Sequence, residues 1–253
     1  MNMQTYSVVD HFELSRETVA ISLSLFDRYM ATLGNDCTGS VALLTSLTTL
    51  FVAVKINETK NIHLRTLADL SRQQFTSKDI ENMEIKLLKE LSWQVNPPTS
   101  VAFVHHLLKF VSNVHPSVRR DLFELSRYLC ELSLCDTFFC DRKPSSVAYA
   151  AILNVFDFMA KSHITSSRTR KRFVADMESS LHLQQCDPDV IESCSRMREM
   201  FASSLELYAQ DGSLLSNQDI MDCCASVCSK GSVDSKKVGS SISYAEESPQ
   251  RVQ

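Results

Sequence analysis

Hydrophobic residues recur with helical spacing in two segments of the first half of the chain, residues 41–56 and 77–91. Residues three and four positions apart lie on the same face of a helix, so each segment predicts a helix with a wide apolar face. The second segment is preceded by Thr76 and carries Asp79 three residues later, which is the pattern of a capping box at a helix start. A short amphipathic helix is predicted between the two, over residues 64–72.

Each of these two apolar faces carries one charged residue. Lys55 lies almost in line with Phe51 on the first face, and Glu84 lies between Ile80 and Leu88 on the second. A charge is costly to bury unless it is paired and hydrogen-bonded. The two residues could therefore reach solvent at the edge of the core, pair with each other, or point out of an apolar surface toward a partner. Periodicity alone leaves these alternatives open.

Helical periodicity continues along most of the chain and predicts an all-α fold. Further helices are predicted over residues 15–33, 99–111, 116–135, 144–160, 168–181 and 187–210. The 144–160 segment is apolar on all sides, which predicts a buried central helix. Pro97 and Pro98 interrupt the pattern, and Thr99 can cap the helix that follows. We therefore expect two helical domains, residues 1–96 and 97–211, and a flexible serine-rich tail, residues 212–253.

The positions of the glycines exclude several classes of enzyme. The chain has five glycines, and none lies between residues 40 and 211. Phosphate-binding loops, dinucleotide fingerprints and nucleophile elbows need glycine where the backbone approaches a ligand or takes a positive φ. We therefore expect no such motif in the folded body of the protein, and no catalytic residues are assigned.

The net charge and the cysteines narrow the range of partners and ligands expected for the protein. The net charge of −4 does not imply a nucleic-acid partner, and no run of 18 uncharged apolar residues predicts a membrane span. The nine cysteines lack metal-ligand spacing, and the adjacent His105 and His106 would face different ways on a helix. We expect no metal or other cofactor. Reduced thiols favour a place in the nucleus or the cytoplasm.

Four motifs follow one another over about ninety residues. They are ETVAISLSLFDRYM, LFVAVKINE, NMEIKLLKELSW and NPPTSVAF, at residues 17–30, 50–58, 82–93 and 96–103. In order, spacing and identity they resemble the cyclin box of the A/B-type cell-cycle cyclins. The lysine and the glutamate are the signature pair of that family, and the separation of Lys55 from Glu84 matches it. The resemblance implies two tandem five-helix repeats, although the second half matches by pattern and only weakly by residue.

The resemblance also implies a function. Cyclins are regulatory subunits that bind and activate a cyclin-dependent serine/threonine protein kinase as a heterodimer, and are not themselves enzymes. The kinase-binding residues would be Lys55, Glu84, Ile56, Leu88 and Trp93. Two interpretations of Trp93 stay open, a buried anchor of the core or of the two repeats, and an edge exposed to the kinase. Leu88 is open in the same way. Asp27 and Arg28 follow the family's D-R pair, for which we expect an internal hydrogen-bonded contact.

The start of the chain departs from the family pattern. Residues 1–9 can supply only the end of the first helix, so the first repeat is expected to lack most of that helix. The M-R-x-x-L residues that dock substrates in cyclins are missing there, and so is the N-terminal destruction motif. A cyclin-fold scaffold without kinase activation is therefore an alternative function. A transcription-factor-like cyclin-fold protein is another. A helical enzyme with Lys55 and Glu84 in a closed pocket is a third, and it fits the motifs less well.

Two further short patterns stand outside these motifs. Ser248 begins S-P-Q-R, which fits the S-P-x-K/R pattern phosphorylated by cyclin-dependent kinases, and is a possible phosphorylation site. Five residues, 168–172, read RTRKR. Such a basic cluster is either a solvated helix start or a nuclear-import signal.

Overall fold

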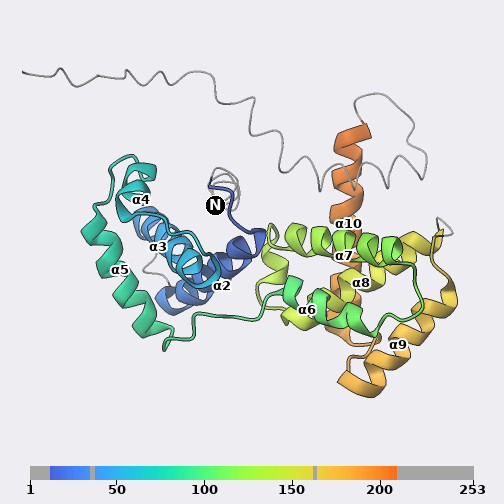
Figure 1. Cartoon of the computed structure of the whole chain (residues 1–253). Helices are drawn as coiled ribbons and strands as arrows, with labels where there is room; N and C mark the ends of the chain where they lie inside the picture. The colour runs from blue at the N-terminus through green and yellow to red at the C-terminus, as the bar shows by residue number, and fades with distance from the viewer. Residues whose placement is uncertain (1–11, 35–37, 162–163, 210–253) are drawn as a thin grey trace, which may run out of the picture.

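The hydrophobic periodicity gives helices throughout the computed structural model, which describes residues 12–34, 38–161 and 164–209. Within these ranges the chain forms nine α-helices, two short 3-10 helices and no strand, so the predicted all-α fold is confirmed. The helices form two bundles joined by an extended linker (Figure 1). The predicted remnant of a first helix and the whole predicted tail, which includes Ser248, lie outside the described residues.

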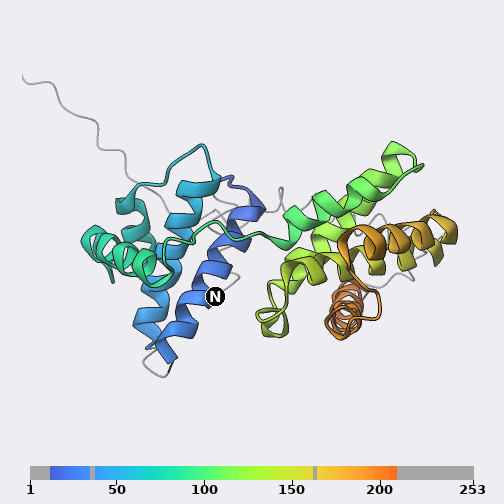
Figure 2. The ribbon, with the colours of Figure 1, turned by 90° about the horizontal axis from the view of Figure 1, so that it is seen from below.

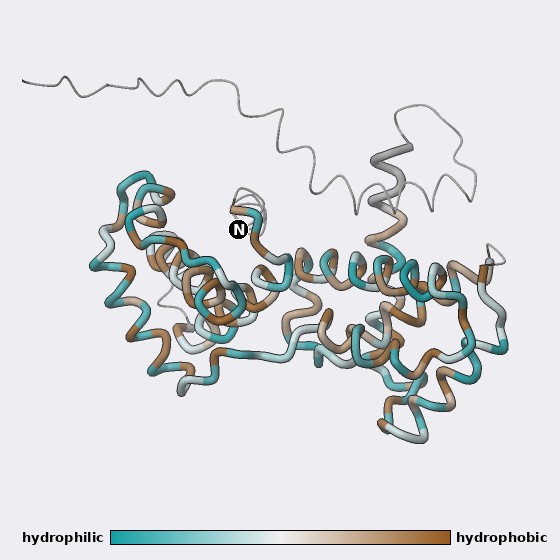
Figure 3. Tube along the Cα trace, in the orientation of Figure 1, coloured by the Kyte–Doolittle hydropathy of each residue, from teal (hydrophilic) through white to brown (hydrophobic). Residues whose placement is uncertain are grey.

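The first bundle contains four helices, each starting close to its predicted position. They are α2 (Arg16–Leu33), α3 (Gly39–Asn57), α4 (Leu64–Leu70) and α5 (Ser77–Glu90). Ser15 caps α2 by accepting a hydrogen bond from the backbone N–H of Glu17. Thr76 and Asp79 form the predicted capping box of α5. Hydrophobic and hydrophilic residues alternate along α5 at the helical period (Figure 3).

Helix α3 lies at the centre of this bundle, between α2 and α5. It is long and apolar enough to cross a membrane by length and composition alone, yet half of that stretch is buried inside the protein, as in the core helix of a packed bundle. Two of its buried threonines are satisfied locally, since the Thr48 hydroxyl donates to the Leu44 carbonyl at 2.8 Å and Thr49 donates to the Ser46 carbonyl at 3.1 Å. Small side chains of this kind let α2 and α3 pack closely, and the Ser22 hydroxyl donates to Thr49 across the contact.

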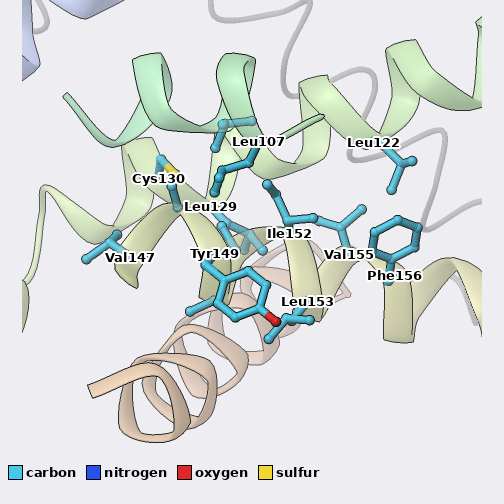
Figure 4. Close-up of a cluster of buried hydrophobic side chains, with 14 of the residues drawn as sticks. Leu107, Leu122, Leu129, Cys130, Val147, Tyr149, Ile152, Leu153, Val155 and Phe156 are labelled. Carbon is cyan, nitrogen blue, oxygen red and sulfur yellow. The ribbon is translucent and has the colours of Figure 1, made fainter. Parts of the chain in front are cut away.

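The second bundle contains five α-helices. They are α6 (Ser100–Leu107), α7 (Pro116–Ser133), α8 (Pro144–Lys161), α9 (Ser167–Leu181) and α10 (Pro188–Ala209). Helix α8 packs against α6, α7 and α10, and residues 146–156 are buried without interruption. Figure 4 shows Tyr149, Ile152 and Phe156 of α8 among the side chains that fill this core. The predicted buried central helix is confirmed.

One predicted helix is shorter than expected. The pattern predicts a helix over residues 99–111, but α6 ends at Leu107 and is followed by a 3-10 turn, η2 (Leu108–Phe110). The Arg119 guanidinium of α7 donates to the carbonyl of Leu108 at 2.7 Å and also to the carbonyl of Val111. The last four carbonyls of a helical segment have no partner within it, so these bonds satisfy two carbonyls at the end of this one.

The linker and the contacts beside it connect the two bundles (Figure 2). Arg28 on α2 donates to the carbonyl of Gln94 in the linker at 2.7 Å, which confirms the internal contact predicted for this residue. The Thr99 hydroxyl, which also caps α6, donates to the Glu17 carboxylate at 2.6 Å. Asp27 faces Cys140 of the second bundle at 3.5 Å, and burial raises the pKa of the Asp27 carboxyl. These polar contacts join the two bundles together with Leu134, which follows α7 and packs against the core of the first bundle.

Candidate functional site

Lys55 and Glu84 meet on one side of the first bundle. Lys55 lies in the last turn of α3, and Glu84 lies in the middle of α5. The Lys55 ammonium forms an ion pair with the Glu84 carboxylate and sits 4.4 Å from the centre of the Phe51 ring, within the range of a cation–π contact. Among the alternatives that the sequence left open, the free chain adopts the mutual pair.

This ion pair is at the surface. The Lys55 side chain is 40% exposed and the Glu84 side chain is 16% exposed. Exposed ion pairs contribute only about 0–1 kcal/mol to stability, so the fold does not depend on this one. The pair also leaves hydrogen-bonding capacity, because an ammonium has three donors and a carboxylate has about four acceptor sites. A partner's backbone could bind here without the ion pair being broken.

The three apolar residues assigned to kinase binding lie on the same bundle as the pair. Ile56, next to Lys55, is 36% exposed, and Trp93, beyond the end of α5, is 69% exposed. Leu88 is half-buried and packs against the core between α2, α3 and α5. Together with Lys55 and Glu84, these residues form what we call the α3/α5 face. They are the five residues assigned to kinase binding, and their placement on one bundle is compatible with that prediction.

Ile85 is a further exposed residue that sequence reasoning missed. It follows Glu84 directly and is 54% exposed. It lies off the apolar stripe formed by Ile80, Met83 and Leu87, so periodicity assigns it to the solvent side of α5. The available signal was an isoleucine at a position where that pattern expects a polar residue.

The structure corrects one of the two interpretations of Trp93. A tryptophan that is 69% exposed is not a buried anchor of the core or of the repeats. The chain leaves α5 through two successive left-handed residues, Ser92 at φ 50° and Trp93 at φ 60°. This turn is closed by a 2.9 Å hydrogen bond from the Trp93 backbone N–H to the Leu88 carbonyl. It turns the indole toward solvent, while Leu91 takes the buried position.

The other candidate residues lie away from this face. His105 and His106 are exposed on α6, and no group of three or more potential metal ligands occurs in the part of the chain that the structure describes. Cys130 and Cys194 are buried free thiols, and burial raises the pKa of Cys194 to about 11. The basic cluster at residues 168–172 forms the first turns of α9 in the second bundle.

Comparisons with known proteins identify the family to which the two bundles are similar. A family model described as "Cyclin, N-terminal domain" matches residues 5–96, and one described as "Cyclin, C-terminal domain" matches residues 98–196. Cyclin-A1-1 of Arabidopsis thaliana is 23% identical over 193 residues, which cover 74% of this chain and 40% of that protein. The G2/mitotic-specific cyclin-B3 of Mus musculus is 25% identical over 142 residues, covering 56% of this chain and 10% of that protein. The chain thus spans well under half the length of these relatives.

The fold is similar to that of a solved viral cyclin from herpesvirus saimiri. The TM-score is 0.59 at 19% sequence identity, and the match covers 80% of this chain and 87% of that one. At this identity the likeness concerns the arrangement of helices. It supports two tandem cyclin-type bundles.

Proposed function

Because this chain belongs to the cyclin family, we propose that it is a regulatory subunit that binds and activates a cyclin-dependent serine/threonine protein kinase in cell-cycle control. In this proposal the chain is non-catalytic and forms a heterodimer with the kinase. The protein would act in the nucleus or the cytoplasm. The observation that carries the proposal is the α3/α5 face, where Lys55 and Glu84 are paired amid exposed apolar side chains.

The mechanism is a shift in the population of kinase conformations. Protein kinases need an ion pair between a strand lysine and a glutamate of their C-helix for phosphoryl transfer. A partner that binds only the conformation with this helix held inward raises the fraction of active kinase. Moving that fraction from about 1% to about 99% needs roughly 5.5 kcal/mol of differential binding.

Charges and apolar residues would share that energy. Hydrogen bonds to charged groups contribute about 1.5–3 kcal/mol each, so one bond each from Lys55 and Glu84 would reach the required amount only at the upper end of that range. Trp93 and Ile56 already lie in water in the free chain, so covering them gains hydrophobic energy at about 25 cal/mol per Å². In this scheme the charges set the orientation of the kinase, and the apolar side chains add affinity.

The test is capture of a cyclin-dependent kinase by the purified full chain, followed by a histone kinase assay of the bound fraction. Lys55→Ala and Glu84→Ala are each expected to reduce both capture and activity at least tenfold, because partner groups are left unpaired. Lys78→Ala is the matched control, since Lys78 forms an exposed ion pair with Glu81 on the same helix. It should behave as the native chain does.

The outcomes separate the alternatives. Equal capture by all variants would place the kinase interface elsewhere and refute the assignment of the α3/α5 face. Capture without a rise in activity would favour the scaffold that lacks kinase activation. Activity of the chain alone, without any kinase, would contradict its non-catalytic role.

A further inference from the structure

Three basic residues share the outer face of the first two turns of α9. Arg168, Lys171 and Arg172 are spaced i, i+3 and i+4, which places them on one side of a helix. All three are exposed. The opposite side of α9 carries Phe173 and Met177, which are buried in the core of the second bundle. We call the three cations the α9 triad.

The α9 triad is not neutralised by its surroundings. None of its three side chains has a hydrogen bond or an ion pair within the part of the chain described by the structure. Arg170, on another side of the same helix, instead pairs with Asp157 at 2.7 Å and donates to Gln185 at 3.0 Å. Asp176 follows Arg172 by one turn and could have paired with it, but no ion pair joins them.

The position of the α9 triad at the start of its helix adds to the local positive potential. The first turn of α9 contains no acidic residue. The helix dipole is positive at this end, so a cation in the first turn, here Arg168, is unfavourable by about 0.3–1 kcal/mol. A cluster of unpaired cations at a positive helix end is thus a local site of positive potential on a chain whose net charge is −4.

We propose that the α9 triad binds a phosphate group carried by a serine or threonine of a partner protein. A phosphorylated side chain brings about −1.5 to −2 charges and three strong acceptor oxygens. Three cationic donors within one helical turn suit one such group, because bonds from guanidinium and ammonium groups to phosphate are charge-assisted. From Arg168 to Arg172 the helix rises about 6 Å at 1.5 Å per residue, which favours a single anionic group over a continuous nucleic-acid backbone.

The α9 triad lies far from the α3/α5 face. Figures 1 and 2 both show α9 and α5 at opposite ends of the molecule. A phosphorylated partner at α9 and a kinase at α5 would therefore occupy separate surfaces. The inference goes beyond the proposed function, and it can be tested on the free chain without any kinase.

The experiment measures fluorescence anisotropy of labelled glycine–serine peptides with the full chain at low ionic strength. One peptide carries a single phosphoserine, a second is unphosphorylated, and a third has glutamate at the same position. The native chain should bind the phosphopeptide at least tenfold more tightly than either other peptide. The triple variant R168Q/K171Q/R172Q should lose at least tenfold in affinity, with its helix content checked by circular dichroism.

A matched variant controls for net charge. R65Q/R72Q/R120Q removes three exposed arginines that lie on other elements and should bind the phosphopeptide within twofold of the native affinity. Equal loss in both triple variants would show a general charge effect and overturn the proposal. Equal binding of all three peptides would also overturn it. So would binding of a labelled single-stranded oligonucleotide that is tighter than binding of the phosphopeptide and is lost in R168Q/K171Q/R172Q. Failure of kinase capture at the α3/α5 face would leave this result unaffected.

Discussion

The central helices of the two bundles end differently. Helix α8 is buried without interruption over residues 146–156, and its neighbours α6, α7 and α10 surround it. The buried run of α3 stops at Val54, and the next three residues, Lys55, Ile56 and Asn57, are exposed. The second bundle also exposes large apolar side chains, at Phe110, Leu181 and Ile191, but these lie on its outer elements. In the first bundle the central helix itself exposes one, Ile56. An interaction surface at this end of α3 is the role proposed above.

Both central helices nevertheless carry an ion-paired charge near their C-terminal ends. Lys55 of α3 pairs with Glu84 of α5, and Asp157 of α8 pairs with Arg170 of α9. The charge on the central helix is positive in the first bundle and negative in the second, and in each case a neighbouring helix supplies the opposite charge. A charge at this place is therefore no mark of function by itself. What distinguishes the first bundle is that Ile56, Ile85 and Trp93 are exposed on α3, on α5 and just beyond α5.

The sharpest test of this comparison uses the same substitution in both central helices. Ile152→Ala on α8 removes a fully buried side chain and should lower the free energy of unfolding by about 2–5 kcal/mol. Ile56→Ala on α3 removes an exposed one and should cost under about 1 kcal/mol. Urea unfolding followed by circular dichroism measures both. Equal losses would show that Ile56 belongs to the core.

Removal of a helix cap in each bundle should lower the free energy of unfolding by a smaller amount. Thr76→Ala removes the cap of α5 and breaks a reciprocal box with Asp79, so it should cost about 1–2 kcal/mol. Ser166→Ala removes the single cap of α9 and should cost about 0.5–1 kcal/mol. Thermal unfolding of both variants gives the comparison. A larger loss for Ser166→Ala would mean that the box adds nothing to the cap.

The two ion pairs should contribute similarly little to folding. Double-mutant cycles on Lys55 with Glu84, and on Asp157 with Arg170, should each give a coupling below about 1 kcal/mol, because all four side chains are partly exposed. In the proposed complex only the first pair should also affect kinase capture. Loss of capture on breaking the Asp157–Arg170 pair would remove the functional distinction between the two helices.

The smallest expected effect is a dependence on pH at the start of α5. Hydrogen bonds from the Thr76 backbone and hydroxyl hold the pKa of the Asp79 carboxyl below its usual value of 3.8. The folded pKa is the lower one, so the stabilisation is fully present above the unfolded pKa and is lost as pH falls through the folded value. The native chain should therefore lose its advantage over Asp79→Asn at acid pH. A difference that stays constant down to the lowest pH would contradict this assignment.

The sequence predicted the helices well because their ends carry local signals. Ser15, Thr76 and Thr99 cap the helices that they were expected to begin. The early end of α6 was not predicted, because the apolar spacing continues to Val111. The Arg119 side chain that binds the Leu108 carbonyl lies eleven residues further along the chain. Contacts of this kind leave no trace in local periodicity.

The candidate site was predictable in part for the same reason. The motifs and spacing pointed to Lys55 and Glu84 together, and the structure brings them into contact. The exposure of Trp93 could not be deduced, because it follows a turn of two left-handed residues, neither of which is a glycine that would have indicated it. Ile85 was missed because its neighbours on the chain define a stripe to which it does not belong. The role of all these residues in kinase binding stays a prediction.

The turn that exposes Trp93 has a practical consequence. Trp93 is the only tryptophan of the chain, so intrinsic indole fluorescence reports on a single location. Because the ring is already 69% exposed in the folded state, unfolding should shift its emission maximum only slightly. Covering the ring with a second protein should instead move the emission to shorter wavelength. The emission maximum of Trp93 would then report binding of a partner at this location and would respond little to unfolding.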